Sequence, residues 1–328
     1  MLYGQVSFPG FGIGPIELDP DAFSIGDFAI KWYAIFIVTG ILFAAWYVYT
    51  QGKKKGLLLD DLLDCALYIV FPAIICARLY YVIFKKLENP NLYTTFASWF
   101  DIRSGGLAIY GAIIGGALIA FLVLYLKKIR IPVFFDLMAP GVMVAQAIGR
   151  WGNFMNIEAH GGETDSIFRM GILEGGKEIF VHPTFLYESL WNLVGFGLIL
   201  LLYYKLRLQK FDGQIVLSYL AWYGLGRLWI EGLRTDSLYI GSSGIRVSQL
   251  VALLCLIGAT AALVFFLIYF KKPWIAKCIY YDNAKHYADG VKQIETLAKK
   301  RAEKKAEKEA RKAEKETAKK EKPNASEE

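Results

Sequence analysis

Two stretches of the sequence place arginine, glutamate and amide side chains at helical spacing within apolar surroundings. In the first, residues 149–163 (GRWGNFMNIEAHGGE), Arg150, Asn153 and Asn156 recur every third residue and so share one helix face. A guanidinium is permanently charged and binds phosphate oxygens in a fork, and amides add uncharged hydrogen bonds. The set predicts a clamp for a phosphate-bearing head group at a membrane edge. Helix capping with a snorkelling arginine is the alternative, but it explains one polar residue better than five.

The second stretch is YGLGRLWIEGLR, which aligns Tyr223, Arg227, Glu231 and Arg234 along one stripe of a helix. Arg227 can pair with Glu231, and Glu231 can reach Arg234. An ion-pair ladder that only holds helices together is the alternative interpretation. Two arginines for one glutamate leave a positive excess, however, which favours anion binding on this face.

Single polar or small residues elsewhere have weaker signals. Tyr33 in KWYAIF is typical of an aromatic at a membrane interface. Arg78 lies deep in an apolar run and needs a partner, either structural or functional. Gly111 and Gly115 form a small-xxx-small pair that is more often packing than chemistry. His182, at the start of an apolar helix, is expected to be a structural hydrogen-bonding residue.

The elements that must position these residues are membrane-spanning helices. The chain of 328 residues is 55% hydrophobic, which is above the composition of soluble globular domains. Apolar runs long enough to cross a bilayer recur along it. We predict an all-α integral membrane protein with seven such helices, at residues 28–50, 62–84, 105–126, 133–149, 184–204, 213–230 and 249–270.

Loop charge predicts the orientation of these helices. Lysines and arginines cluster at residues 53–55, 127–130, 205–210 and 271–272, in alternate loops, which places those loops in the cytoplasm. The N-terminus is then outside and the C-terminus inside, and residues 149–163 face the extracytoplasmic side. Residues 1–30 carry no lysine or arginine, so we expect no cleaved leader. The longer outer loops suggest a small extracytoplasmic head.

The tail differs in composition from the rest of the chain. We predict a catalytic membrane domain over residues 1–272 and a cytoplasmic Lys/Glu/Ala-rich tail, helical or disordered, over residues 273–328. Glu/Lys pairs of this kind usually make a solvated helix, with a contact to anionic lipid or RNA as the less favoured alternative. No nucleic-acid partner is expected. The four cysteines form no C-x-x-C, and no metal site is predicted.

These stretches together resemble the prolipoprotein diacylglyceryl transferase family. The signature is G-R-x-G-N-F-x-N-x-E in residues 149–158, joined by KWYAIF, GGLAIYGAIIGG, HPTFLYE and YGLGRLWIEGLR, over about residues 5–272. The resemblance implies a seven-helix bundle with a small outer head in the bacterial cell membrane. It implies transfer of the diacylglyceryl group of phosphatidylglycerol to the lipobox cysteine of a prolipoprotein signal peptide, with glycerol phosphate as the leaving group. No metal or cofactor is implied.

The resemblance also assigns site residues. It implies that the family's essential or signature residues fall on Tyr33, Arg150, Asn153, Glu158, Gly161, Tyr223, Arg227, Glu231 and Arg234. One position departs from the pattern, because many members have a histidine, often proposed as the base, where this chain has Tyr110. A tyrosine, with a pKa of about 10, is a poor base at neutral pH.

The implied reaction requires stabilisation of the departing phosphate and removal of the thiol proton, and the residues suggest clear candidates only for the first. Charge on the departing phosphate must be stabilised, and we expect Arg150 and Arg227 to hold the phosphate, with Asn153 adding a hydrogen bond. Glu231 is expected to orient Arg227, and Arg234 to complete the network. We expect Asn156, Glu158, Gly161 and Tyr223 to contribute to binding of phosphatidylglycerol. For proton transfer from the thiol, Tyr33, Tyr110 and His160 all remain candidates, with His160 ahead of His182.

Two other functions fit the composition. A transporter or channel for an anionic solute would use the same arginines for selectivity, although the internal repeats common in transporters are not evident. An integral scaffold would use the bundle only as an anchor for its cytoplasmic tail.

Overall fold

The computed structural model describes residues 4–26, 28–101, 105–174, 176–237, 239, 244–270 and 272–320. Lys271 and the last residues of the predicted tail therefore lie outside the described part. The chain forms two compact units. Unit 1 comprises Met1–Val48 and Pro132–Ala276, and unit 2 comprises Tyr49–Ile131 and Lys277–Glu328.

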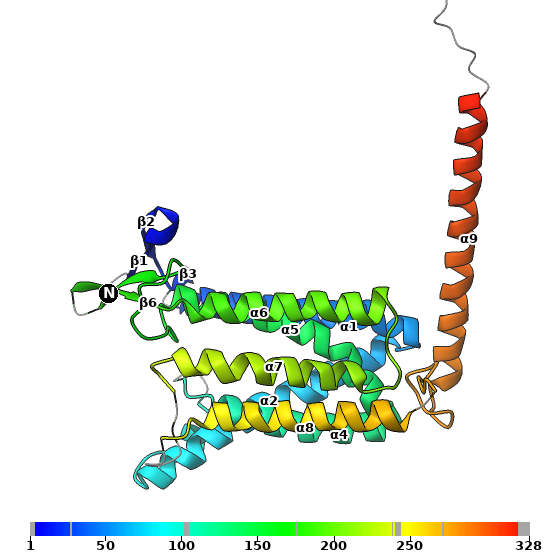
Figure 1. The fold of residues 1–328 in the computed structure, drawn as a ribbon. Helices are drawn as coiled ribbons and strands as arrows, with labels where there is room; N and C mark the ends of the chain where they lie inside the picture. Colours follow the sequence, from blue (N-terminus) through cyan, green and yellow to red (C-terminus); the bar gives the residue numbers. More distant parts are fainter. Residues whose placement is uncertain are drawn as a thin grey trace, which may run out of the picture. The chain divides into compact units, whose positions relative to one another are not determined.

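Unit 1 contains a bundle of long apolar helices (Figure 1). These are α1 (Trp32–Gly52, of which the last turn belongs to unit 2), α5 (Ile131–Met155), α6 (Thr184–Ile199, continued by the π-helical η3, Leu200–Lys205), α7 (Gln214–Leu233) and α8 (Val247–Tyr269). Small residues bring the helices close, since Gly141 of α5 faces the backbone of Ala44 in α1, and Gly224 of α7 faces that of Ala252 in α8.

A small β-structured head stands at one end of this bundle (Figure 1). One sheet has the order β2-β1-β5-β6 and is antiparallel throughout. Its strands are β1 (Gly4–Phe8), β2 (Ile13–Leu18), β5 (Met170–Glu174) and β6 (Lys177–Val181), with the short helix η1 (Pro9–Phe11) between β1 and β2. A hairpin of β3 (Asp21–Ile25) and β4 (Phe28–Lys31) leads into α1. We call the end of the unit 1 helices beside these strands the head end.

The strands refine the prediction of an all-α protein with a head of loops. Most of the chain is helical, but the head is built on hydrogen-bonded strands. The hydropathy pattern missed them because each is only four to six residues long, and because β1 and β5, which pair with each other, are separated by more than 100 residues of chain. Pairing over such separations is not visible in local periodicity.

The core of the head extends onto the ends of the helices. Val6, Met170 and Val181 from three strands are buried with Phe185 of α6. Phe154, Met155 and Ile157, from the end of α5 and the residues after it, pack against this cluster. The apolar side chains of residues 149–163 thus face the head core, which leaves Arg150 and Asn153 to point elsewhere.

Helix α5 is longer than its apolar run. The hydropathy pattern ends at residue 149, whereas the helix continues to Met155, so Arg150 and Asn153 are helical. Asn156 lies just past the last helical residue, although its N–H still bonds the Gly152 carbonyl at 3.2 Å. Hydropathy reports the polarity of side chains and does not show where the backbone hydrogen bonds of a helix end.

Unit 2 pairs two long helices, α2 (Leu59–Glu88) and α4 (Ile109–Leu126). An added Cβ on Gly111 would lie 2.5 Å from the Cys76 carbonyl, and the glycine at 115 faces the same cysteine, so the small-xxx-small pair is confirmed as helix packing. A short helix α3 (Phe96–Trp99) lies in the connection between α2 and α4.

Arg78 of α2 has a structural environment. Its side chain is buried, with 1% of the residue exposed. It donates to the carbonyls of Ser98, Trp99, Gly105 and Gly106, and it stacks near the rings of Tyr81 and Tyr93. Of the two interpretations left open by the sequence, the described contacts favour the structural one, because Arg78 fastens the connection after α2 to that helix.

The segment after residue 276 returns to the loops of unit 2. Tyr280 is fully buried, and its hydroxyl donates to Asp61 at 2.7 Å and accepts from the Leu58 N–H at 3.1 Å. Gln293 donates to the carbonyls of Lys53, the first residue of the short helix η2 (Lys53–Lys55), and of Leu57, which follows that helix. Beyond this contact α9 (Tyr287–Lys320) continues as an exposed helix with Glu/Lys and Glu/Arg pairs.

Six helices of the described part are long and apolar enough to cross a membrane. They correspond to α1, α2, α4, α5, α6 with η3, and α8. Helix α7, at the predicted residues 213–230, forms but carries polar side chains and is not one of the six. The chain is therefore a multi-pass membrane protein.

Candidate active site

Three helices of unit 1 meet at one buried carboxylate near the head end. Glu188, in the first turns of α6, is only 6% exposed. One of its oxygens lies 2.5 Å from Nη2 of Arg150 on α5, and the other lies 2.7 Å from Nη1 of Arg227 on α7. The arginines that the sequence places on separate helices thus converge on the two oxygens of a single side chain.

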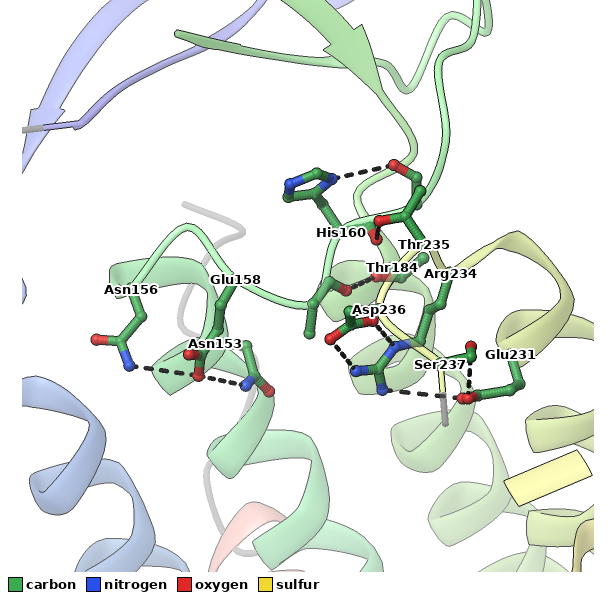
Figure 2. A network of polar contacts seen from close by, with 12 residues as sticks. Asn153, Asn156, Glu158, His160, Thr184, Glu231, Arg234, Thr235, Asp236 and Ser237 are labelled. Carbon is green, nitrogen blue, oxygen red and sulfur yellow. Dashed lines mark hydrogen bonds and ion pairs between the residues drawn. The ribbon is translucent and has the colours of Figure 1, made fainter. Parts of the chain in front are cut away.

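The ion pairs continue along α7. Arg227 also contacts Glu231 at 2.6 Å, and Arg234 lies 3.9 Å from Glu231 and 3.9 Å from Glu188. The predicted pairing of Glu231 with both arginines is confirmed. Arg234 further makes a bidentate contact with Asp236, and Ser237 donates to Glu231 at 2.8 Å (Figure 2).

The charge balance of this cluster differs from the expected positive excess. Glu188 from α6 and Asp236 after α7 supply carboxylates that the α7 stripe alone does not show. Among the described residues of the cluster, Arg150, Arg227 and Arg234 face three carboxylates. Because a buried guanidinium needs a counter-charge, this balance keeps the arginines in place without a ligand.

Two tryptophans fix α6 against α7 one turn below the pair of Glu188 and Arg227. The rings of Trp191 and Trp222 stack with centroids 4.2 Å apart. Each indole N–H donates to the backbone carbonyl of the other residue at 3.0 Å. Gly226 and Gly195 lie directly against these rings, where a larger side chain would overlap them. This reciprocal contact defines the register that sets Glu188 opposite Arg227.

The two signature asparagines bind a glutamate of the same stretch. The amide nitrogens of Asn153 and Asn156 donate to one oxygen of Glu158, at 2.8 Å and 3.3 Å (Figure 2). The carbonyl oxygen of Asn153 is then turned toward Arg150, 3.4 Å from its Nη1. Glu158 thus orients the amides, and Asn153 links the signature loop to the arginine cluster.

The loop after α5 has a constrained backbone. Ile157 and Ala159 adopt φ values of 50° and 58°, which are uncommon for non-glycine residues and strained for a β-branched one. The Ala159 carbonyl accepts a hydrogen bond from the Thr184 hydroxyl at the start of α6 (Figure 2). The head core and this bond together hold the loop in its conformation.

Gly161 lies where three segments converge. It forms an antiparallel bridge with Arg234, and its N–H donates to the His182 carbonyl at 2.9 Å. An added Cβ would lie 2.7 Å from the Cβ of His182 and 3.0 Å from the Leu233 carbonyl. Only glycine fits this approach, which joins the signature loop to the end of α7.

The other predicted residues have different positions. Tyr33, the second residue of α1, lies against Gly152, whose added Cβ would be 2.5 Å from its ring. The ring of Tyr223 lies one turn before Arg227 on α7 and 6.1 Å from that of Tyr219. Tyr110 is the second residue of α4 and belongs to unit 2.

The two histidines near the site make local hydrogen bonds. Nδ1 of His160 lies 3.1 Å from the Gly161 carbonyl, and Thr235 donates to the His160 carbonyl at 3.4 Å. Nδ1 of His182 lies 3.3 Å from the Tyr187 hydroxyl, which fits the structural role expected of it.

Asp236 is the carboxylate of the cluster that lies past the end of α7. The hydrogen bonds and charge of the Arg234 guanidinium lower the pKa of Asp236 below its ordinary value, against the opposing effect of partial burial. Asp236 therefore stays ionised well into the acidic range, and it anchors the side chain of Arg234.

Glu188, like Asp236, is a network residue to which the sequence motifs assign no role. It occurs in HPTFLYE, one turn into an apolar helix. A lone acid within an apolar helix needs a cationic partner, so the sequence does indicate that Glu188 is paired. The sequence does not reveal which cations pair with Glu188, because Arg150 and Arg227 are on other helices.

The fold and the site define a multi-pass membrane protein in which a chain of buried ion pairs, shared by three helices, lies beneath a β-structured head. The model of one family, described as prolipoprotein diacylglyceryl transferase, matches residues 20–266. The chain belongs to this family, which makes it a transferase. Membership does not favour the alternative of a transporter.

Individual relatives agree over most of their length. The phosphatidylglycerol--prolipoprotein diacylglyceryl transferase 1 of Clostridium perfringens (strain 13 / Type A) is 44% identical over 255 residues, covering 75% of this chain and 94% of the relative. The enzyme named phosphatidylglycerol--prolipoprotein diacylglyceryl transferase of Streptococcus pneumoniae (strain Hungary19A-6) is 44% identical over 263 residues, or 78% of this chain and 97% of the relative. That of Ligilactobacillus salivarius (strain UCC118) is 41% identical over 260 residues, or 75% and 92%.

Proposed function

We propose that this chain transfers the diacylglyceryl group of phosphatidylglycerol to the lipobox cysteine of prolipoproteins. The sulfur of the cysteine attacks the glycerol CH₂ carbon that carries the phosphate. A carbon–sulfur bond forms, the carbon–oxygen bond to phosphate breaks, and glycerol phosphate leaves with the electron pair of that bond. The observation that carries the proposal is the convergence of Arg150 and Arg227 on Glu188, from two different helices.

Glu188 leaves both arginines able to bind a phosphate. A guanidinium has five N–H donors. Glu188 contacts one terminal nitrogen of each arginine, Glu231 contacts the other terminal nitrogen of Arg227, and Asn153 lies 3.4 Å from the other terminal nitrogen of Arg150, so each arginine keeps N–H groups for a phosphate. Arg150 keeps 24% of its side chain exposed and Arg227 keeps 12%, so Arg150 is the more accessible of the two. In this proposal a lipid phosphodiester first meets Arg150, and the negative charge that grows on the departing phosphate is stabilised by both.

The remaining residues hold this pair in position. Glu231 contacts Arg227 directly, and Glu158 aligns Asn153 beside Arg150. The reciprocal contact of Trp191 with Trp222 holds α6 against α7. We propose that the lipid site also includes Asn156, Gly161, Tyr223 and Arg234. Because the donors are fixed before the lipid arrives, little reorganisation is required during the reaction.

The proton of the attacking thiol has several possible acceptors. Arginine charge favours the thiolate, which is the nucleophile. Tyr33 lies against Gly152 of the signature stretch, and His160 belongs to that stretch. Both remain candidates to relay the proton, as does Tyr110. The departing glycerol phosphate is itself a base that can accept it.

We place the protein in the bacterial cell membrane with α7 as a seventh span, the N-terminus and head outside, and the C-terminus in the cytoplasm. The basic residues at 53–55, 127–130 and 205–210 support this orientation. Helix α7 packs against α6 and α8, which are themselves apolar enough to span, and α7 can therefore carry its polar face inside the bundle. The active site then faces the extracytoplasmic side.

A transfer assay tests the function. The purified chain would be incubated with phosphatidylglycerol radiolabelled in its diacylglyceryl part and with a lipobox peptide. Label should appear on the peptide, and it should be absent from a peptide whose cysteine is replaced by serine. Absence of label from the cysteine peptide would contradict the proposed reaction.

A further inference from the structure

Two turns of the head meet in a protruding tip. The short helix η1 joins β1 to β2, and residues 163–169 join the signature loop to β5. Gly10 in η1 lies directly against the backbone of Ile167, with no room for a side chain between them. We define the apolar tip as four residues with exposed fractions of 53%, 45%, 61% and 47%: Phe11, Ile13, Ile167 and Phe168. The rings of the two phenylalanines are 5.8 Å apart.

Several backbone N–H groups of the two turns are hydrogen-bonded within the tip. The Thr164 hydroxyl accepts from the Ser166 N–H at 3.2 Å, and the Ser166 hydroxyl accepts from the Phe168 N–H at 3.3 Å. In the other turn, the Gly12 N–H bonds the Pro9 carbonyl at 3.1 Å. Satisfying backbone groups internally lowers the cost of moving a turn out of water.

The cationic residue beside the tip, Arg169, is bound to the head. Arg169 donates to the carbonyls of Asp165 and Ser166, and its guanidinium lies over the ring of Phe180, 5.4 Å from the centroid. The guanidinium is thus bound to the head itself. The tip exposes four large apolar side chains, and its neighbours Thr164, Ser166 and Arg169 are hydrogen-bonded within the head, which is unusual for a surface that faces water alone.

The strand that runs into the tip contacts the head end of the apolar helix α5. Trp151 at the head end of α5 contacts Phe154, with ring centroids 5.8 Å apart, and Phe154 contacts Phe8 of β1 at 6.2 Å. Phe11 follows one short turn later. In Figure 1 the hairpin of β1 and β2 stands beside the head end of α6 and is displaced to one side of that helix, not stacked on its axis.

We propose that the apolar tip inserts into the interfacial region of the lipid leaflet on the head side of the membrane. The occupant is lipid because aromatic contacts lead from the membrane-spanning helix α5 to Phe8 of β1, the strand that runs into the tip, and because the hairpin of β1 and β2 stands to one side of the head end of α6. Phenylalanine and isoleucine on internally bonded turns suit the boundary between head groups and acyl chains. The proposal does not depend on the reaction or on which side of the membrane the head occupies.

Insertion has a consequence for the signature loop. Ile167 and Phe168 belong to the connection between Gly161 and β5, so a tip held in lipid fixes one end of that connection. Gly161, at its other end, is bridged to Arg234. The depth of the tip therefore sets the height of the loop relative to the leaflet.

Site-specific fluorescence tests the insertion. A full-length chain with its four cysteines replaced would carry Phe168→Cys, labelled with bimane, in nanodiscs with or without brominated acyl chains. We expect the bromine-containing lipid to quench this label at least twofold. Leu254→Cys, on the exposed face of α8, serves as the inserted control, and Lys177→Cys, on exposed β6, serves as the aqueous control.

The outcomes separate the possible occupants. Quenching at position 168 near that of position 254 supports insertion, and quenching equal to that of position 177 overturns it. If the label responds to a lipobox peptide but not to brominated lipid, the tip binds peptide and the proposal is wrong. The proposal is also wrong if the fluorescence of the label changes only with protein concentration, because that would indicate contact with a second copy of the chain. Phe11→Cys provides an independent site if the first variant does not fold.

Discussion

Arg150 and Arg227 are held by opposite oxygens of one carboxylate, at 2.5 Å and 2.7 Å from Glu188. The bundle thus brings together two cations that would otherwise repel each other in a low-dielectric environment. A phosphodiester has the same arrangement of two oxygens on one centre. We therefore regard Glu188 as the residue that keeps the arginine pair preorganised while no lipid is bound.

Glu188→Gln should disrupt this pair. The amide keeps the size of the side chain but removes the charge shared by both arginines, and losing one partner of a buried pair costs roughly 3–5 kcal/mol. We expect a lower thermal unfolding temperature in detergent and at least a tenfold loss of transfer. Glu174→Gln, on the exposed end of β5, is the matched control and should leave both unchanged. Normal transfer by Glu188→Gln would show that the shared carboxylate is dispensable.

Gly161→Ala should disturb the signature loop, whereas Gly162→Ala should not. At position 161 the new methyl group would lie 2.7 Å from the His182 side chain, but at position 162 nothing lies within 4 Å. Overpacking of this kind costs about 1–3 kcal/mol. Transfer rate and unfolding temperature should fall in the first variant alone. Equal effects of the two alanines would argue against close approach at Gly161.

Acid should weaken the contact of Asp236 with Arg234. Because the pKa of Asp236 is lower in the folded protein than in the unfolded chain, the contact stabilises the fold above the unfolded pKa of about 3.9. The contribution is lost as the pH falls through the folded pKa. Unfolding temperatures measured between pH 7 and pH 3 should therefore converge for the wild type and Asp236→Asn at the acidic end. A constant difference at all pH values would exclude this linkage.

Removal of the exposed part of α9 should leave transfer unchanged. Side chains from Lys299 to Thr317 are exposed, whereas Gln293 is hydrogen-bonded to the loops of unit 2 and Leu297 is the last half-buried residue of the helix. A chain ending at residue 298 keeps those contacts. Its transfer rate should equal that of the full chain. Loss of transfer with normal folding would favour the alternative in which the tail carries the function.

Some of this arrangement could be predicted from the sequence and some could not. The stripe of Arg227, Glu231 and Arg234 follows from helical spacing, and two of its ion pairs form as predicted. The cross-helix role of Glu188 does not follow from spacing, because its partners are on α5 and α7. The reciprocal contact of Trp191 and Trp222 and the sheet pairing of β1 with β5 are likewise products of tertiary packing.

The phosphate-binding role of the arginine pair is tested most directly by Arg150→Ala and Arg227→Ala in the transfer assay with labelled phosphatidylglycerol and a lipobox peptide. Each variant should insert into the membrane at normal levels, as measured by fractionation, and each should lose transfer by at least a hundredfold. If both variants modify the peptide at the wild-type rate, the two guanidinium groups do not hold the phosphate.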